Sequence, residues 1–242
     1  MKLSLIVPCY NEKPNLRLLI EHFRKAIGTQ PDVELILVDN GSTDGSADVF
    51  REELSRPENQ FARVVTVPVN LGYGFGIISG LRAARGEFLG WTHADLQTDP
   101  KDLIVGFSKL LAESEPTRCF LRGRRIRRGL FDSAFTAGMS VVASAALGTW
   151  LHDINAQPKL MHRSFFESLT AAPDDFSLDL YVLYAAKKAG LKVLELPVTF
   201  AKRNAGDAKG GGSLRGKFKL IRRTFRYIFS LRRGLSPKVK KG

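Results

Sequence analysis

The chain of 242 residues is long enough for one large domain, and its hydrophobic fraction of 44% and charged fraction of 25% are typical of a globular protein. Its two cysteines, Cys9 and Cys119, are too few for a disulfide framework, so a reducing cytoplasm is the expected compartment. The formal net charge is +13, but residues 211–242 hold 11 Lys and Arg and no Asp or Glu, so the preceding body is nearly neutral.

The first hundred residues alternate short apolar runs with segments of helical spacing. Leu3–Pro8 is too short for the apolar core of a secretory signal, so we interpret it as a buried strand. Continuous apolar strands joined by helices predict a mostly parallel sheet covered on both faces, with ligands beyond the carboxyl ends of its strands. The expected strands are Leu3–Val7, Val33–Val38, Arg63–Val67 and Glu87–Trp91, and the expected helices are Asn15–Ile27, Gly45–Leu54 and a stretch from Ile77 to Ala84.

The second part of the chain is less regular. Phe135–Leu151 carries no charge, but it is weakly apolar and shorter than the ~20 residues that span a membrane, so we expect a buried or interfacial helix there. A glycine-rich stretch over residues 206–212 then precedes the basic tail. The other expected elements are a helix over Pro100–Ala112, a strand over Arg118–Arg122, a basic loop over Arg122–Gly129, a helix over Asp179–Ala189 and a strand over Lys192–Phe200.

Three motifs follow expected strands, and together they are specific. SLIVPCYNE, VDNGSTDGS and HADLQTDP resemble the opening motifs of glycosyltransferase family 2, and the later motif order resembles its polyprenyl-phosphate branch, typified by dolichyl-phosphate mannosyltransferase. The resemblance runs from Leu3 to about Lys209. It implies an α/β type A glycosyltransferase fold, Rossmann-like, with a catalytic domain over residues 1–210. Residues 1–97 would form its nucleotide-sugar half and 98–210 its acceptor half, before a basic amphipathic tail at 211–242.

A carboxylate ends the second expected strand, and the resemblance gives it a nucleotide-binding role. Asp39 can accept hydrogen bonds from a base or a ribose, and Asn40 stands where the family usually has a second aspartate. The turn Asn70–Gly76 resembles the family's N-x-G-x-G turn, in which glycines let the backbone approach the nucleotide. The alternative is that Asp39 and Ser42 cap the following helix. The implied nucleotide-sugar-binding residues are Pro8, Tyr10, Glu12, Asp39, Asn40, Gly72 and Asp95.

The motif His93-Ala94-Asp95 falls where the family carries an Asp-x-Asp metal motif. A sugar nucleotide leaves as a diphosphate, and a divalent ion held by oxygen ligands neutralises the charge that builds on it. The resemblance implies that Asp95 binds the metal and that Gln97 and His93 occupy further ligand positions. The expected cofactor is Mg²⁺ or Mn²⁺, and the choice stays open because imidazole is a poor Mg²⁺ ligand. Helix capping by Asp95 is the alternative.

Three cations are the expected phosphate ligands. Arg125 aligns with the arginine of the branch's Gly-Ser-Arg-Tyr motif, and Phe200–Lys209 resembles its F-x-x-R-x-x-G-x-S-K pattern. Guanidinium groups recognise phosphate bidentately and keep their charge. The resemblance therefore implies that Arg125, Arg203 and Lys209 hold the diphosphate and an acceptor phosphate. A solvated basic loop is the alternative for the stretch around Arg125.

Asp179 lies where relatives carry an acidic residue on a helix that faces the site. It has two possible roles, general base or salt-bridge partner to an arginine, and we favour the partner role. The expected catalytic residues are thus Asp95, Arg125 and Asp179. The segment Asp153–Lys159 matches only partly the D-x-x-S-G-F of the mannosyltransferases, which indicates a different sugar or acceptor.

The tail Ser213–Arg233 has apolar residues at steps of three and four with cations between them, which is typical of an amphipathic helix. Basic amphipathic helices lie on anionic membranes, so membrane contact is the first interpretation and docking on the body the second. Nucleic-acid binding is not expected. The apolar positions are Leu214, Phe218, Ile221, Phe225, Ile228 and Phe229.

By resemblance, the reaction is inverting transfer of a sugar from a UDP- or GDP-sugar to a polyprenyl phosphate, by a cytoplasmic protein peripheral on the inner face of the membrane. An acceptor phosphate is already anionic near neutral pH, so it needs positioning more than a strong base. Two alternatives are transfer to a lipid or glycan hydroxyl, with Asp179 as the base, and a non-catalytic nucleotide-sugar-binding module. The sequence does not indicate an oligomeric state.

Overall fold

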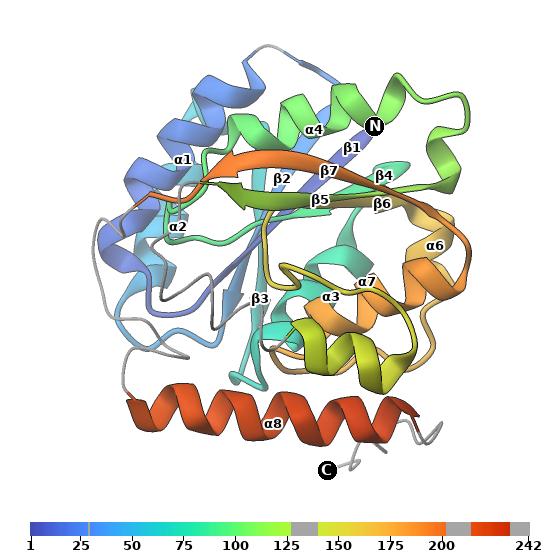
Figure 1. Ribbon diagram of the computed structural model, residues 1–242. Helices are drawn as coiled ribbons and strands as arrows, with labels where there is room; N and C mark the ends of the chain where they lie inside the picture. The colour runs from blue at the N-terminus through green and yellow to red at the C-terminus, as the bar shows by residue number, and fades with distance from the viewer. Residues whose placement is uncertain (29, 127–139, 202–213, 233–242) are drawn as a thin grey trace.

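The computed structural model describes residues 1–28, 30–126, 140–201 and 214–232, with the side chains of the last range from Arg222 onward. Its centre is a seven-stranded sheet in the order β3-β2-β1-β4-β6-β5-β7 (Figure 1). The strand pairs are parallel, except that β6 runs antiparallel to both β4 and β5. The predicted mostly parallel α/β sheet is confirmed.

The first half of the sheet follows the apolar runs of the sequence. β1 and β2 are buried along nearly their whole length because helices cover both faces of the sheet. Each helix and strand expected in this half is present. In chain order they are β1 (Leu3–Cys9), α1 (Lys13–Ile27), β2 (Val33–Asn40), α2 (Ser46–Leu54), the 3-10 helix η1 (Pro57–Asn59), β3 (Ala62–Val67), α3 (Tyr73–Ala83) and β4 (Phe88–Trp91).

The second half contains a strand that the sequence did not predict. β6 (Lys159–His162) lies between β4 and β5, within the segment that was interpreted only as a motif. The expected basic loop is wrong in its first part, because β5 continues through Ile126 in parallel with β7. The remaining elements are α4 (Lys101–Leu111), the 3-10 helix η2 (Pro116–Arg118), β5 (Cys119–Ile126), α6 (Arg163–Glu167), α7 (Leu178–Lys188) and β7 (Lys192–Thr199).

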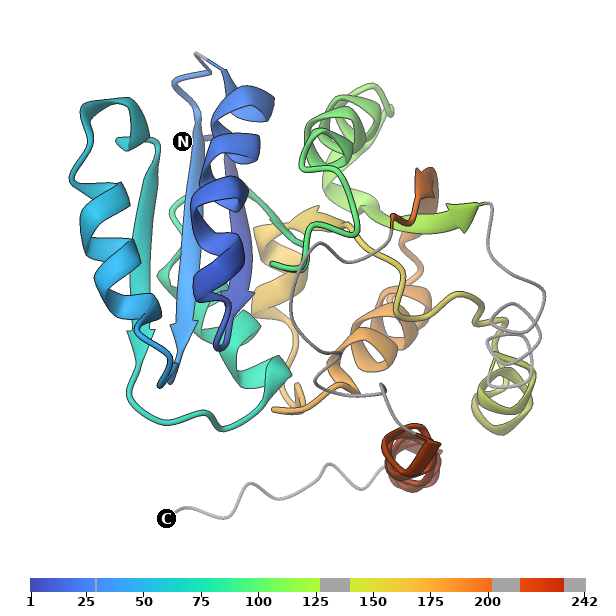
Figure 2. The same cartoon turned by 90° about the vertical axis from the view of Figure 1, so that its left-hand side faces the viewer.

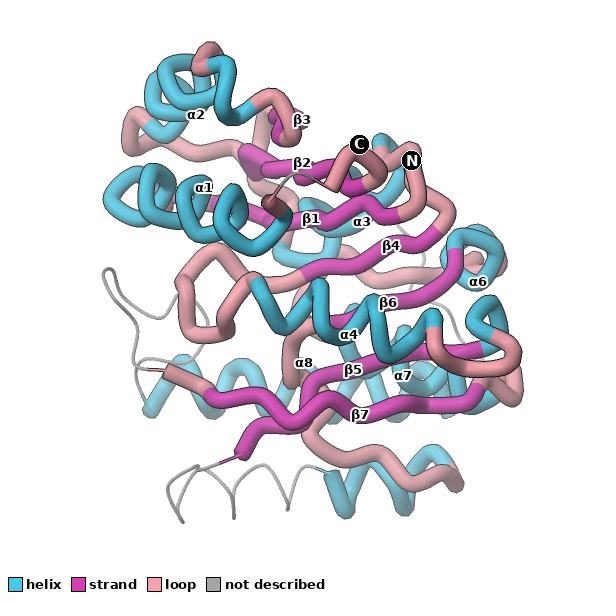
Figure 3. The backbone as a smooth tube through the Cα atoms, turned by 90° about the horizontal axis from the view of Figure 1, so that it is seen from above, coloured by secondary structure: helices cyan, strands magenta, loops and turns pink. Residues whose placement is uncertain are grey.

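Helices form a layer on each side of the sheet (Figure 2). On one side α1, α2 and α4 bury apolar residues such as Phe23, Phe50 and Leu110 against the strands. On the other side α3, α6 and α7 do the same, for example with Ile77 and Leu183. Figure 3 shows the sheet face-on, with its strands side by side from β3 to β7, α1 and α4 in front of it and α3 and α7 behind it.

The loops after β1, β2 and β4 meet at one edge of the sheet. All three strands are parallel, and β1 lies between β2 and β4. The register pairs Cys9 with Asp39 and Ile6 with Trp91, so the strand ends that carry the three motifs are close together.

Residues 140–147 form a helix that is buried on one side only. Ala143 and Leu147 are buried, whereas Val141 and Trp150, just beyond the helix, are 55% and 61% exposed. The expected interfacial or buried helix is therefore present in its described part, while residues 135–139 lie outside the described ranges. No helix among the described residues is long and apolar enough to cross a membrane.

The C-terminal helix α8 (Leu214–Arg232) packs against the layer that contains α3 and α7 (Figure 1). Its Tyr227 and Ile228 are buried in that layer, whereas Phe229 is 50% exposed. The described part of the tail helix thus docks on the body, as the second interpretation predicts. It also leaves Arg222 and Arg232 exposed.

Candidate active site

Asp39 ends β2 at the shared edge and is only 5% exposed. Its Oδ1 accepts a hydrogen bond from the backbone N–H of Ser42 at 3.0 Å, and the carboxylate has no ion pair among the described residues. The helix-capping alternative is wrong, because Asp44 instead accepts from the backbone N–H of Ser46 at 3.0 Å at the start of α2. Oδ2 of Asp39 is therefore left for a ligand.

The loop after β1 is fastened to the loop after β2. The backbone N–H of Asn11 donates to Oγ of Ser42 at 3.1 Å, and the backbone N–H of Thr43 donates to Oδ1 of Asn11 at 2.8 Å. These bonds hold both loops beside Asp39. The other expected nucleotide residues are half-buried: Pro8 lies near the end of β1, and Tyr10 and Glu12 lie in the loop after it.

The glycine-rich turn serves packing within the protein. Gly72 has a φ of 131°, and a Cβ there would lie 2.3 Å from the carbonyl oxygen of Asp174. Asn40 donates through Nδ2 to the carbonyl oxygen of Gly72 at 2.9 Å. The turn therefore packs closely against the segment before α7. The predicted close approach of its glycines to the nucleotide stays a prediction. Asn40 acts by holding this turn.

The loop after β4 carries the expected metal ligands. Asp95 is 6% exposed, and its Oδ1 accepts a hydrogen bond from the backbone N–H of Gln97 at 3.2 Å. Gln97 donates through Nε2 to the carbonyl oxygen of Ala201 at 3.1 Å and accepts from the Ala201 N–H at 2.8 Å. The loop is thus tied to the end of β7, and Asp95 sits at the same edge as Asp39.

A buried polar network lies behind His93. Nζ of Lys159 is 2.6 Å from Oδ1 of Asp179, and Nε2 of Gln157 donates to the same oxygen at 3.1 Å. The Tyr73 hydroxyl lies 3.0 Å from Nε2 of His93 and donates to Oδ2 of Asp179 at 3.4 Å. Asp179 therefore forms a salt bridge, as favoured. Its partner is Lys159, so the expectation of an arginine partner was wrong.

Burial decides the charge state of this network. It lowers the pKa of the His93 imidazole, against the attraction of Asp95 and Asp179, so the ring is neutral near pH 7. Burial and then the charge of Asp179 raise the pKa of the Tyr73 hydroxyl well above its ordinary value. Burial also lowers the pKa of Lys159, and Asp179 opposes that shift. A neutral tyrosine and a neutral histidine therefore stand beside one buried ion pair.

Sequence reasoning missed Tyr73 and Lys159 as members of the site. Tyr73 stands inside the glycine-rich turn, where only the glycines were given a role, and its ring stacks on Phe176 with centroids 4.7 Å apart. Lys159 is fully buried, with Nζ 5.7 Å from the ring centroid of Trp91. Lys159 is the first residue of the four-residue strand β6 and directly precedes Leu160 and Met161. A lysine next to apolar residues was the signal in the sequence that it is buried and paired with a carboxylate.

Arg125 lies at the site but already has a carboxylate partner. Its guanidinium is bound side-on by Oδ1 of Asp153, and its backbone N–H donates to Oδ2 at 2.8 Å. The guanidinium also lies over Phe200, 5.6 Å from the ring centroid. Arg122, expected where a strand gives way to the basic loop, is buried and pairs with Glu195 at 2.6 Å. The solvated-loop alternative is wrong for Arg125, whose side chain is 12% exposed.

Residues 4–119 match the family model of glycosyl transferase family 2. This stretch, a little under half of the chain, contains all three strand-end motifs. The resemblance read from the three motifs is confirmed.

Two curated relatives of this chain are named for transfer to a polyprenyl phosphate. The undecaprenyl-phosphate 4-deoxy-4-formamido-L-arabinose transferase of Photorhabdus laumondii is 28% identical over 214 residues, which cover 86% of this chain and 62% of the relative. The dodecaprenyl-phosphate galacturonate synthase of Rhizobium johnstonii is 29% identical over 238 residues, 96% of this chain and 65% of the relative. The chain thus spans a little under two thirds of each relative's length.

Solved structures confirm the type A glycosyltransferase fold. The glucosyl-3-phosphoglycerate synthase of Mycobacterium tuberculosis, in complex with Mn²⁺, UDP and its product, superimposes with a TM-score of 0.73. The match covers 98% of this chain and 81% of that chain at 19% sequence identity. The same enzyme was also solved with Mg²⁺ and UDP, with a TM-score of 0.72.

The residues in the loop after β4 suit a divalent cation that the protein and a bound diphosphate would hold together. Within the described ranges no group of three His, Cys, Asp or Glu side chains could hold a metal by itself. Asp95 offers a buried carboxylate, whereas Gln97 uses its amide N–H₂ on Ala201 and His93 has Nε2 beside Tyr73. Mg²⁺ is commonly held by one or two carboxylates plus substrate phosphates, which is the arrangement that one carboxylate permits.

Two expected phosphate ligands lie outside the described residues. Arg203 and Lys209 fall in the range 202–213. Arg125 is therefore the one expected phosphate-binding cation that the described part of the chain places at the site.

Proposed function

We propose that the chain is an inverting glycosyltransferase that moves a sugar from a nucleotide sugar to a polyprenyl phosphate at a membrane surface. One observation carries the proposal: two buried carboxylates, Asp39 at the end of β2 and Asp95 in the loop after β4, lie at the same edge of the sheet on either side of β1. A nucleoside at Asp39 and a diphosphate at Asp95 would then span the carboxyl end of β1. The names of the two polyprenyl-phosphate relatives support this acceptor class.

Each residue has a separate task in this reaction. Asp39 accepts hydrogen bonds from the base or ribose through Oδ2, and the loops after β1 and β2 shape the pocket around it. Asp95, with His93 and Gln97 beside it, would hold Mg²⁺ or Mn²⁺ against the diphosphate, and the ion supplies charge neutralisation as the diphosphate leaves. Arg125, held in one orientation by Asp153, presents a fixed guanidinium edge to a phosphate.

The contacts of Asp179 favour a phosphate acceptor over a hydroxyl acceptor. A hydroxyl must lose its proton, whereas a phosphate is already anionic. Asp179 is 2% exposed and is held by Lys159 and Gln157, so its carboxylate is committed to the protein. An ion pair of this kind leaves the carboxylate inaccessible to an acceptor hydroxyl. The alternative of a hydroxyl acceptor therefore lacks a base among the described residues of the network.

The finer assignments belong to the same proposal. The donor is a UDP- or GDP-sugar, and Arg203 and Lys209 join Arg125 in binding phosphates. The protein is peripheral on the inner face of the membrane, which it contacts through the exposed face of α8 with Arg222 and Phe229. Each exposed cation near an anionic surface contributes about 1 kcal/mol of binding free energy.

The test pairs each of a panel of UDP- and GDP-sugars with a short polyprenyl phosphate or with the polyprenol of equal chain length, in Mg²⁺, Mn²⁺ or EDTA. We expect glycolipid only from the phosphate and only with a divalent ion. Asp95→Asn should lower the rate at least about 100-fold, whereas Asp48→Asn, on the exposed face of α2, should leave it unchanged. If glycolipid formed from the polyprenol, the acceptor would be a hydroxyl and the proposed phosphate acceptor would be wrong. If the chain bound the nucleotide sugar without turnover, it would be a non-catalytic binding module.

A further inference from the structure

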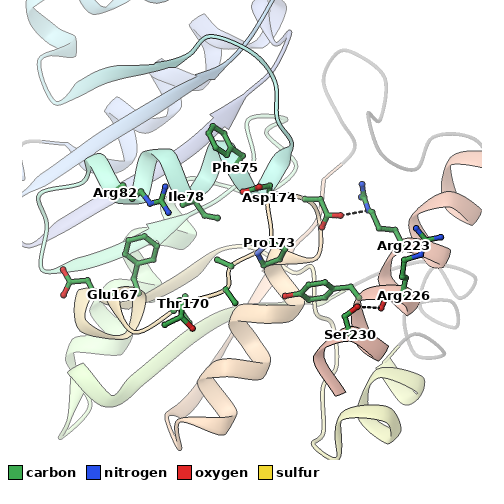
Figure 4. Close-up of a pocket in the computed structure, with 16 residues that line it drawn as sticks. Phe75, Ile78, Arg82, Glu167, Thr170, Pro173, Asp174, Arg223, Arg226 and Ser230 are labelled. Carbon is green, nitrogen blue, oxygen red and sulfur yellow. Dashed lines mark hydrogen bonds and ion pairs between the residues drawn. The ribbon is translucent and has the colours of Figure 1, made fainter. Parts of the chain in front are cut away.

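A large cavity is lined by none of the residues assigned to the active site. It has a volume of about 900 Å³ and is enclosed by α3, by the segment 166–175 that leads to α7, and by α8 (Figure 4). Pockets that hold drug-sized ligands have volumes of about 300–1,000 Å³. The cavity is therefore large enough for a ligand of its own.

Most of the cavity wall is apolar. Phe75 and Ile78 line it from α3, and Leu169 and Pro173 line it from the segment before α7 (Figure 4). Ile78 is 5% exposed and Leu169 packs against the same buried cluster, so these side chains form a continuous apolar wall. Such a wall gains free energy by taking up hydrocarbon from water.

One buried polar group on α8 lacks a partner. Tyr227 lines the cavity and is only 7% exposed, and its hydroxyl makes no hydrogen bond to any described residue. Burial raises the pKa of this hydroxyl well above its ordinary value, so it is a neutral donor at any physiological pH. A buried hydroxyl without a partner costs free energy, which a ligand oxygen that accepts its proton would recover.

Charged side chains line both ends of the cavity, and Asp174 lies between them. In Figure 4, Arg223 and Arg226 project from α8 at one end, whereas Arg82 and Glu167 lie at the other. Nε of Arg223 is 3.1 Å from Oδ2 of Asp175, so the charge of this arginine is already balanced. Arg226 is exposed and has no ion pair with a described residue. The α8 end therefore offers one cation and, at the next position, one hydroxyl donor.

The same helix exposes further cations on its outer side. Arg222, Phe229 and Arg232 are exposed, a combination that suits an anionic bilayer. A bilayer lying against that side would present phosphate groups next to Arg226 and hydrocarbon chains next to the cavity. A bare phosphate would not cover the apolar wall, and a bare hydrocarbon would leave the Tyr227 hydroxyl without an acceptor.

We propose that this cavity binds one anionic phospholipid of the bilayer, with an acyl chain against Phe75, Ile78 and Leu169 and the phosphate at Arg226 and the Tyr227 hydroxyl. The site goes beyond the transfer reaction, because it uses none of the residues that bind donor or acceptor there. It would anchor α8 to the membrane by a specific contact in addition to surface charge.

The test uses the full chain without a donor and a short-chain lipid below its micelle concentration. Dihexanoylphosphatidylglycerol is titrated by calorimetry, with glycerol phosphate and dihexanoylphosphatidylcholine as the two comparison ligands. We expect saturable binding at one site, weaker binding of the choline lipid, and no binding of glycerol phosphate. Equal binding of glycerol phosphate would reduce the site to an anion site and would overturn the proposal, as would the absence of lipid binding.

Three variants locate the binding. Tyr227→Phe should weaken lipid binding about 5–10-fold without lowering the melting temperature, because its hydroxyl has no partner among the described residues of the free protein. Arg226→Gln should weaken it to a similar or greater extent. Arg222→Gln is the matched control, since it removes an exposed cation from the same helix but outside the cavity. Equal effects of Arg222→Gln and Arg226→Gln, with none from Tyr227→Phe, would show surface attraction alone and overturn the proposal.

Discussion

The buried pair of Lys159 and Asp179 gives the sharpest prediction of the fold and the site together. Both side chains are almost fully buried, and Nζ lies 2.6 Å from Oδ1. At an effective dielectric constant of 20 the attraction at this distance is about 6 kcal/mol, and most of it offsets the loss of hydration of the two ions. Lys159→Met would leave Asp179 charged and without that offset, so we expect a loss of about 3–5 kcal/mol in the free energy of unfolding.

The double variant Lys159→Met/Asp179→Leu tests whether the instability of the single variant comes from the unpaired charge of Asp179. It removes both charges at similar volume, so it should be much more stable than Lys159→Met and close to the native chain. For a chain of this length the single change corresponds to a fall in melting temperature of about 6–20 °C. Tryptophan fluorescence is a direct probe of unfolding, since Lys159 lies over Trp91.

Two results would refute this reasoning. If Lys159→Met lowered the melting temperature by less than about 3 °C, water would screen the ion pair as it screens a surface pair, and the argument from burial would be wrong. If the double variant were as unstable as the sum of its single changes, the two charges would not interact as the 2.6 Å contact requires.

Three further predictions concern single positions. Gly72→Ala should lower the melting temperature by about 5 °C or more because its Cβ would lie 2.3 Å from a backbone oxygen, whereas Gly190→Ala, with open space at φ +69°, should cost only about 1–2 kcal/mol. Burial and Asp99 raise the pKa of Asp102 from 3.8 to about 6, so ionisation lowers stability as the pH rises through 6; Asp102→Asn should raise the melting temperature by about 2–4 °C at pH 8 and not at pH 3.5. Tyr73→Phe removes the hydroxyl beside His93 and should lower kcat about 5–10-fold with little change in donor KM, as steady-state rates would show.

The sequence predicted the first half of the molecule well, because its apolar runs are unbroken. Strands such as Leu3–Cys9 and Val33–Asn40 are buried on both faces, and a fully apolar run has few other interpretations. The strand ends then placed Asp39 and Asp95 at one edge, as the parallel pairing of β1 with β2 and β4 requires. The sequence therefore predicted which edge of the sheet carries the candidate site and which two carboxylates lie there.

The second half was harder to predict, for physical reasons that the structure makes plain. β6 is only four residues long, and it contains Lys159, whose burial depends on Asp179 from a distant helix. Likewise, β5 includes Arg122, which is buried because Glu195 on the neighbouring strand and His152 pair with it. Local patterns assign such charged residues to solvent, and only the tertiary partner reverses the assignment.

The histidine at the metal motif becomes understandable in this setting. The position of His93 adjoins Tyr73 and is within electrostatic reach of Asp179. A carboxylate there would bring a second negative charge close to Asp179, whose charge is balanced by Lys159 alone among the described cations. A neutral imidazole avoids that repulsion and keeps a hydrogen bond to the tyrosine. The cost is one fewer anionic group beside Asp95, so we expect the affinity of the proposed site for a divalent ion to depend on the diphosphate that binds with it.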